Sequence, residues 1–302
     1  MEPKQSIFKR IHNDGFTWHD SIFTIFFLFI FLILFVSLAE TPVLNLLEKC
    51  FPSIIDDGFW SLFMMYASTI FTWIVFVAYC ALTKRNRFIL NKITPKEKGN
   101  TVKMLLLGFL IGFGENALGI LTAVLNSDIH LAYEGCSIIG FIAMFIVVFI
   151  QSSSEEFCCR GFLYQRLLKG YRSPWVAIIG NALIFMSLHL LNPGVSVIPI
   201  LHLVAIAIFF SLFVYYFDSI WLPMAFHAAW NFTQNIIFGL PNSGIVSSFS
   251  FMKLEAARGQ ITFFYDPTFG VEGSAFLLIV TIAASIAVII IGEKKKKASP
   301  SV

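Results

Sequence analysis

The stretch that decides the fold is IIGFIAMFIVVFI (Ile138–Ile150), followed directly by QSSSEEFCCRGFLY (Gln151–Tyr164). The first part has no charged or polar side chain and is long enough to form much of a membrane-crossing helix. The second part places two adjacent glutamates, Glu155 and Glu156, at the end of that helix. An ionisable side chain at membrane depth is costly unless it is paired or hydrated, so this glutamate pair needs a physical explanation.

The whole chain has the composition of a membrane protein. Of its 302 residues, 57% are hydrophobic and only 13% are charged. A soluble protein is closer to half apolar and a quarter charged. We find neither the short alternating segments of a transmembrane β-barrel nor a nucleic-acid-binding motif. The sequence therefore predicts an all-α, polytopic bundle in the cell membrane, with the lipid bilayer as a partner and no nucleic acid.

Apolar runs, separated by Pro, Gly and Asn residues, predict eight membrane spans. The expected spans are Ser21–Ala39, Gly58–Leu82, Met104–Leu125, Ile138 to about the glutamates, Trp175–Leu191, Val195–Phe217, Ser219–Phe238 and Ser274–Ile291.

Lys and Arg are distributed unevenly between the connecting segments. Eighteen of the 21 fall on the side of the N-terminus, and Lys49, Lys253 and Arg258 fall on the other side. Because Lys and Arg collect in cytoplasmic loops, this distribution supports eight spans and predicts that both termini are cytosolic. The first apolar run ends in SLA (Ser37–Ala39), which would suit signal-peptide cleavage, but the length of the run favours an uncleaved anchor.

The two glutamates differ in what the sequence offers them. Arg160 follows Glu156 by four residues, so the two side chains share one helix face and can form an ion pair. Glu155 is rotated by about 100° from that face and can contact something else. We therefore expect Glu156 to be a structural partner of Arg160 and Glu155 to be free for chemistry.

Two further apolar runs contain histidines with a partner one turn away. Phe185 precedes His189 by four residues in FMSLHLLNP, and Asn231 follows His227 by four residues in AFHAAWNF. The two members of each pair share one face of a helix. In a membrane span such a histidine must find a partner away from water, which makes both pairs candidate functional residues.

The expected hairpin around Tyr171–Pro174 brings two of these residues to the same height. Glu155 lies about 17 residues before the turn and His189 about 17 residues after it, so two helical arms would place them side by side. His227 lies about 12 Å into the seventh span. We therefore expect the three side chains to meet, in the cytosolic half of the membrane.

A glutamate, two histidines and an amide suit the activation of a water molecule. A carboxylate in a low-dielectric pocket can serve as a general base, and a histidine–asparagine pair can donate to a developing oxyanion. Glu155, His189 and His227 would also suffice as ligands of a catalytic Zn²⁺ with one open position. The residues favour neither the metal-free version nor the zinc version. The sequence has no HExxH motif of the thermolysin type.

Three motifs stand in order, each in an apolar run: Glu155-Glu156-x-x-x-Arg160, Phe185-x-x-x-His189 and His227-x-x-x-Asn231. They resemble the motifs of the CAAX-protease and bacteriocin-processing (CPBP) family, which includes type II CAAX prenyl endopeptidases and abortive-infection membrane proteins. Members are usually described as metalloproteases, although a metal-free, glutamate-based mechanism has also been argued for the family.

The resemblance implies a role for each motif residue. Glu155 would activate water with His189 as its partner, and His227 with Asn231 would form the oxyanion site. The remaining motif residues, Glu156, Arg160 and Phe185, would support the site. The resemblance also implies a peptide or protein substrate and divides the chain into an N-terminal three-span region (1–137), a catalytic core (138–238) and a C-terminal part with an outer loop, a last span and a basic tail (239–302).

Two other classes of function use similar residues. A proton-coupled transporter would use them as a relay, but it is expected to show inverted repeats, and we find none. A non-catalytic immunity or scaffold protein would keep the fold without the reaction.

Two polar features lie outside the motifs. Glu115 and Asn116 stand in GFGENALG, whose glycines allow close helix contact. We expect them to form a structural hydrogen-bonding pair rather than part of a polar cavity wall. His202 matches no motif position and is expected to be a packing or rim residue.

Overall fold

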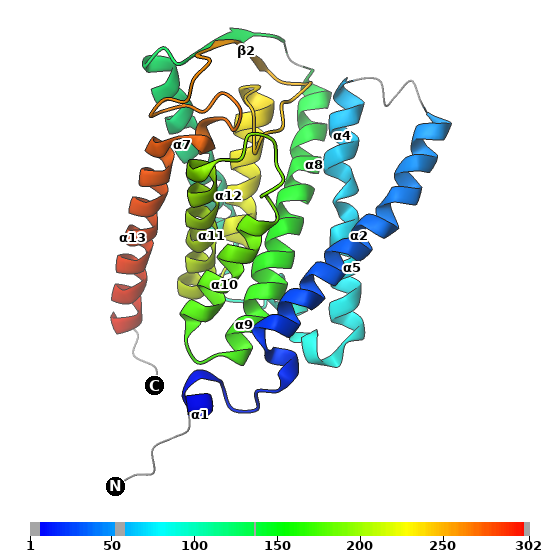
Figure 1. Cartoon of the computed structure of the whole chain (residues 1–302), viewed down its shortest axis with the longest axis vertical. Coiled ribbons are helices and arrows are strands. Elements are labelled where there is room, and N and C mark those ends of the chain that lie inside the picture. The colour runs from blue at the N-terminus through cyan, green and yellow to red at the C-terminus, as the bar shows by residue number, and fades with distance from the viewer. Residues whose placement is uncertain (1–6, 52–57, 136, 299–302) are drawn as a thin grey trace.

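The computed structural model describes residues 7–51, 58–135 and 137–298. These residues form a helical bundle with a small two-stranded sheet at one end (Figure 1). Helix α1 (Ile7–Ile11) and the last turn of α13 (Ala275–Ala298) lie at the opposite end (Figure 1). The expected helical architecture is confirmed.

Six helices in the described part of the chain are long and apolar enough to cross a membrane. They are α2 (Ile22–Cys50), α4 joined to α5 (Gly58–Ser68 and Ile70–Leu82), α7 (Val102–Leu125), α8 with its continuation to Gly170 (Ile138–Glu156 for α8 itself), α11 (Val197–Phe217) and α13. Their outward faces expose many Phe, Leu and Ile side chains, which in water would form an unusually large apolar surface. The chain is therefore a multi-pass membrane protein.

The other elements are short and join or cap these helices. They are η1 (Trp18–Asp20), η2 (Lys84–Asn86), α6 (Phe88–Lys92), β1 (Ile129–Tyr133), η3 (Phe157–Leu163), α9 (Tyr164–Gly170), α10 (Pro174–Ser187), α12 (Trp221–Asn231), η4 (Phe232–Ile237), β2 (Met252–Ala257) and η5 (Val271–Gly273). Strands β1 and β2 pair antiparallel, with Ile129 opposite Ala257.

Two of the eight expected spans correspond to helices shorter than a full crossing. Helix α10 has 14 residues and α12 has 11, the latter prolonged by the six residues of η4. The expected helix to Leu191 is too long, because α10 ends at Ser187. Pro193 lies a few residues beyond the end of α10. A proline disfavours helical backbone at the residue before it, which is Asn192 here. The count of eight spans stays a prediction.

Basic residues of the connecting segments lie at the end of the bundle that holds α1. Arg172, between α9 and α10, donates to the His12 carbonyl at 2.9 Å and pairs with Asp14. Lys295, near the end of α13, lies over the ring of Phe217 at the end of α11. The sheet end carries Lys253 and Arg258 instead. This separation matches the charge distribution expected from the sequence, while the cytosolic assignment of the basic end stays a prediction.

Helix α12 is held against α7 by glycines. A Cβ atom at Gly108 would lie 2.3 Å from the Leu222 carbonyl oxygen, and a Cβ atom at Gly112 would lie 2.3 Å from the Phe226 carbonyl oxygen. Only glycine permits helices to approach this closely. Gly114, by contrast, faces open space. The contact fixes α12, which carries His227, beside α7 and α8.

Candidate active site

Both helices that carry the expected site residues continue as a π-helical turn. Helix α8 continues as η3 directly after Glu156, and α12 continues as η4 directly after Asn231. Such turns accommodate an extra residue and are frequent at functional sites. The backbone is therefore widened immediately after the glutamate pair and immediately after the His227–Asn231 pair.

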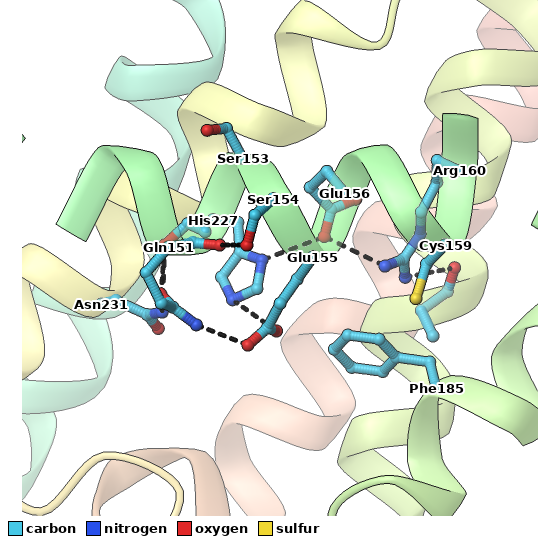
Figure 2. Close-up of polar contacts among 12 residues, drawn as sticks. Gln151, Ser153, Ser154, Glu155, Glu156, Cys159, Arg160, Phe185, His227 and Asn231 are labelled. Carbon is cyan, nitrogen blue, oxygen red and sulfur yellow. Dashed lines mark hydrogen bonds and ion pairs between the residues drawn. The ribbon is translucent and has the colours of Figure 1, made fainter. Parts of the chain in front are cut away.

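Glu156 is bonded to two positively polarised partners. Its Oε1 atom lies 3.0 Å from Arg160 Nη1 and 2.9 Å from His227 Nδ1 (Figure 2). The side chains of Glu156 and Arg160 are both completely buried. The expected Glu156–Arg160 ion pair is confirmed. The second partner, His227, comes from another helix and was not expected.

Arg160 is enclosed by aromatic rings and a backbone carbonyl. Its guanidinium lies 4.6 Å from the centre of the Phe185 ring and 5.1 Å from that of Phe210. Arg160 Nη2 also donates to the Ala207 carbonyl at 3.2 Å. A guanidinium over an aromatic face is attracted to the ring electrons. Phe185 therefore supports the site by packing against the counter-charge of Glu156.

His227 lies between the two glutamates (Figure 2). Its Nδ1 atom bonds Glu156, and its Nε2 atom is 3.9 Å from Glu155 Oε2. The Glu155 side chain is 31% exposed, whereas that of Glu156 is fully buried. The two carboxylates thus occupy the different environments that the sequence predicted. Glu156 fixes the His227 ring, whereas Glu155 faces open space.

Gln151, which the sequence analysis left unassigned, connects both sides of the site. Its Nε2 atom donates to Glu155 Oε1, and its Oε1 atom accepts from Asn231 Nδ2 at 3.1 Å (Figure 2). Asn231 Nδ2 also lies 3.2 Å from Ser152 Oγ, and Asn231 Oδ1 accepts from Asn242. The i−4 spacing from Glu155 was the signal that could have identified Gln151.

His189 is placed by a turn rather than by a helix. It follows the end of α10 at Ser187, and its Nδ1 atom donates to the Phe185 carbonyl at 2.9 Å. Its ring lies 4.7 Å from the Phe185 ring, centre to centre. The expectation of a helical arm at His189 is therefore wrong, although the side chain still lines the same cavity as Glu155.

A cavity of about 420 Å³ joins these groups. Glu155, His189, His227 and Asn231 all line it, as the sequence predicted. Residues from loops and from η5 at the sheet end also line it, namely Asn192, Asn242, Ser243, Ile245, Phe269 and Glu272. The cavity therefore reaches towards the sheet end, whereas the sequence analysis placed the site in the half with the basic residues.

Comparison with known proteins assigns the central helices to a family. Residues 137–233 match the family model described as type II CAAX prenyl endopeptidase Rce1-like. The chain contains an Rce1-like domain. All seven motif residues, from Glu155 to Asn231, fall within the match. No curated protein and no solved structure matches the chain.

A metal site does not form from the expected ligands of this Rce1-like domain. Among the described residues, no group of three or more His, Cys, Asp or Glu side chains could hold a metal ion. Glu155 Oε2 and His227 Nε2 lie 3.9 Å apart, and the Nδ1 atoms of His227 and His189 are bonded to Glu156 and to the Phe185 carbonyl. As placed here, the three side chains do not form a group that holds zinc. We derive no step through zinc, and the metal dependence of the site stays a prediction.

Glu272 is a cavity residue that the sequence analysis missed, because it lies in the short helix η5, far from the motifs. Its Oε2 atom accepts from Trp230 Nε1 at 3.3 Å, and its Oε1 atom accepts from the Ser243 backbone N–H. Burial raises the pKa of Glu272 to about 7, against the hydrogen bonds from Ser243 and Trp230 and the charge of His227, all of which lower it.

The polar residues that stand outside the Rce1-like motifs, Glu115, Asn116 and His202, are each bonded to a side chain from another helix. Glu115 Oε1 accepts from Thr281 Oγ1 at 2.8 Å, and Asn116 Nδ2 donates to Gln234 Oε1 at 2.7 Å. His202 Nε2 lies 3.0 Å from the same Thr281 hydroxyl. Glu115 does not line the cavity, whereas His202 does. Both expectations, a structural polar pair and a packing or rim histidine, agree with these contacts.

Proposed function

We propose that this chain is an intramembrane endopeptidase that hydrolyses a peptide bond in a membrane-associated substrate. The proposal depends on one observation. His227 is bonded to Glu156 on one side and faces Glu155 on the other, and Glu155 lines a cavity of about 420 Å³. These residues lie within the segment that matches an endopeptidase family.

Glu155 is the proposed general base. Gln151 holds its Oε1 atom, and its Oε2 atom faces His227 across 3.9 Å. A water bonded to Oε2 would lie beside His227 and give up a proton to the carboxylate as it attacks the substrate carbonyl. A carboxylate with restricted access to solvent is suited to this role, and general-base catalysis typically contributes about 10²- to 10⁴-fold.

His227 and Asn231 are the proposed oxyanion side. Glu156 fixes the His227 ring by its bond to Nδ1. In the imidazolium form Nε2 also carries a proton and can donate to the oxygen of the tetrahedral intermediate. Asn231 can add a second donor if its amide leaves Gln151 or Ser152. One oxyanion donor is typically worth about 10²- to 10³-fold in rate.

His189 is the proposed donor to the leaving amine. Its Nδ1 atom is bonded to the Phe185 carbonyl, so its other ring nitrogen remains for the substrate. This role follows from its place on the cavity wall with Glu155. Because Nδ1 uses its proton in that bond, Nε2 donates from the imidazolium form of His189. Nε2 gives its proton to the leaving amine, and the proton that Glu155 took from water then replaces it, so both groups return to their starting forms.

The proposed orientation places the basic end and both termini in the cytosol, with eight crossings. The support is the distribution of Lys and Arg between the two ends. Helices α10 and α12 would then be short crossings. Glycosylation-site or cysteine-accessibility mapping of the loops at the sheet end would test this orientation.

The proposal is tested by a peptide-cleavage screen of the purified protein in lipid nanodiscs. Glu155→Ala and His189→Ala are each expected to lower cleavage at least about 100-fold, while Glu255→Gln, on the exposed side of β2, serves as the unaffected control. Cleavage at the wild-type rate by both alanine variants would refute the proposal. A biological activity retained by Glu155→Ala would favour a scaffold instead.

A further inference from the structure

The segment that carries His189 is a turn between two helices. Helix α10 ends at Ser187, and α11 begins only at Val197. Within the turn, the His189 carbonyl accepts from the Asn192 backbone N–H at 3.1 Å. A residue in such a turn is not held by the regular hydrogen bonds of a helix. The position of His189 therefore depends on the contacts that this turn makes with other segments.

Asn192 ties this turn to the loop that follows η4. The Asn192 Nδ2 atom donates to the Ser243 carbonyl at 3.0 Å, and the two residues are 51 positions apart in the sequence. Next to this bond, Pro193 packs so closely against Gly244 that a side chain at Gly244 would collide with the Pro193 carbonyl oxygen. Asn192 and Ser243 both line the cavity. The turn with His189 and the loop after η4 are thus fastened to each other at the cavity wall.

Ser243 has an unusual backbone conformation at this contact. Its φ angle is +48°, in a region that residues other than glycine adopt uncommonly. Such conformations persist where the surrounding structure enforces them, and they cluster at functional sites. The Ser243 N–H donates to Glu272, and the Ser243 carbonyl accepts from Asn192. Two bonds from different segments therefore hold this one residue in its conformation.

The same loop also contacts the proposed oxyanion side. Asn242, the residue before Ser243, donates from Nδ2 to Asn231 Oδ1 at 3.1 Å. The backbone of Asn242 exchanges two hydrogen bonds with that of Ile245, at 2.9 and 2.8 Å, which closes a tight turn. Neighbouring residues of one short loop thus bind Asn231 on one side and the turn with His189 on the other.

We propose that Asn192 is a positioning residue, whose bond to the Ser243 carbonyl fixes His189 relative to Asn231 and to the cavity. The part of this inference that concerns the cleavage rate rests on the proposed function, whereas the part that concerns the placement of the His189 ring does not. Without the bond, the turn can move while the ring keeps its contact with the Phe185 carbonyl. The expected defect is therefore a misplaced histidine rather than a missing one.

The test uses Asn192→Leu in lipid nanodiscs, because leucine is neutral and of similar size but has no donor. A misplaced catalytic group costs up to about 100-fold in rate, and because the bond to Phe185 remains, we expect kcat to fall about tenfold with KM within about twofold of the wild type. NMR spectra of ¹³C-labelled histidine report the placement without cleavage. The His189 signal, identified by its loss in His189→Ala, should move in Asn192→Leu, while that of His202, bonded to Thr281, should not.

Two further sets of variants serve as controls. Asn13→Leu is the matched control, because Asn13 Nδ2 also donates to backbone carbonyls of another segment, at the basic end of the bundle. It should leave kcat and the His189 signal as in the wild type. A pair at Ser243 acts on the backbone. Ser243→Val should displace the His189 signal more than Ser243→Gly, because a β-branched residue disfavours a positive φ angle that glycine tolerates.

The outcomes separate this inference from the proposed function. An unchanged His189 signal in folded Asn192→Leu would overturn the inference, as would an equal displacement in Asn13→Leu. Cleavage that depends on Glu155 but not on Asn192 would also overturn it and would leave the proposed function standing. A His189 signal that moves in Asn192→Leu, in a protein that cleaves no peptide, would support the placement by Asn192 and count against the proposed function.

Discussion

Two glutamates in apolar segments of this protein have different surroundings. Glu115 is enclosed between α7 and α13, where Thr281 satisfies one of its oxygens. Glu155 is held by Gln151 on one oxygen, and its other oxygen faces His227 across 3.9 Å at a cavity. Both glutamates stand in apolar runs of the sequence. The difference shows that a membrane carboxylate is a candidate for chemistry when its packing leaves it open space and a proton-carrying partner.

The largest effect is expected when the buried ion pair between Glu156 and Arg160 is broken. Arg160→Met leaves the fully buried Glu156 with its bond to His227 but without its ion pair. Loss of one partner of a buried pair typically costs about 3–5 kcal/mol of folding stability. Thermal unfolding in detergent should therefore show a large loss. The matched control is Arg172→Met, whose pair with Asp14 is exposed and is worth about 1 kcal/mol or less. Equal losses in the two variants would contradict the structural role of Arg160.

The next effect concerns the group that holds Glu155. Gln151→Leu removes the donor to Glu155 and the acceptor for Asn231. A misplaced catalytic group typically costs on the order of 10²-fold in rate, so kcat should fall by about 10- to 100-fold with little change in KM. Gln165→Leu removes a buried glutamine that does not line the cavity and should leave cleavage unchanged. If Gln151→Leu keeps the wild-type kcat, Gln151 does not position Glu155.

A smaller effect follows from the ionisation of Glu272. Its pKa is raised to about 7, so the ionised fraction should rise from about one tenth at pH 6 to about nine tenths at pH 8. Binding of a peptide that carries Lys, relative to a matched peptide that carries Gln, should therefore strengthen over this interval, because the ionised carboxylate attracts the ammonium group. Other titratable groups line the same cavity, namely Tyr66, Glu155, His189, His202 and His227. The comparison is repeated in Glu272→Gln, where a remaining increase would assign the pH dependence to those groups instead.

The raised pKa of Glu272 also predicts the direction in which folding stability changes with pH. A carboxyl group whose pKa is higher in the folded than in the unfolded state favours folding at low pH, and this contribution is lost as pH rises towards and above the folded value. Wild-type protein should lose stability between about pH 5 and 8 relative to Glu272→Gln. Denaturation midpoints of both proteins, measured across this range, test this prediction. A wild-type protein that gains stability relative to Glu272→Gln as pH rises would show that the folded structure stabilises the ionised carboxylate.

The smallest effect is expected at the enclosed carboxylate. Glu115→Gln can keep the bond from the Thr281 hydroxyl, so the change in unfolding free energy should be about 1 kcal/mol or less. Thermal unfolding of the variant beside Arg160→Met gives the direct contrast. A loss comparable to that of Arg160→Met would mean that the charge of Glu115 supports the fold.

The sequence predicted what depends on local spacing and hydropathy. Six of the eight expected spans are present as long apolar helices, and the i, i+4 spacing of Glu156 and Arg160 was sufficient to predict their ion pair. The end of α10 was missed, because an apolar run continues past Ser187 into the turn that holds His189. Hydropathy does not distinguish an apolar turn from an apolar helix.

The remaining features depend on contacts between distant segments. The bond between His227 and Glu156 joins residues 71 positions apart, and nothing in either motif indicates it. Glu272 reaches the cavity from η5, beyond the last motif. The helix positions of Gln151 and Asn231 were available from the sequence, but their contact depends on how α8 and α12 pack.

The most direct test compares the two carboxylates in one assay. Glu155→Gln and Glu115→Gln are neutral, equal-sized changes on α8 and α7, and both proteins are purified in nanodiscs and assayed for peptide cleavage beside the wild type. We predict that Glu155→Gln loses at least about 100-fold in rate, while Glu115→Gln stays within about twofold of the wild type. Cleavage by Glu155→Gln at the wild-type rate, with both variants folded, would contradict the account.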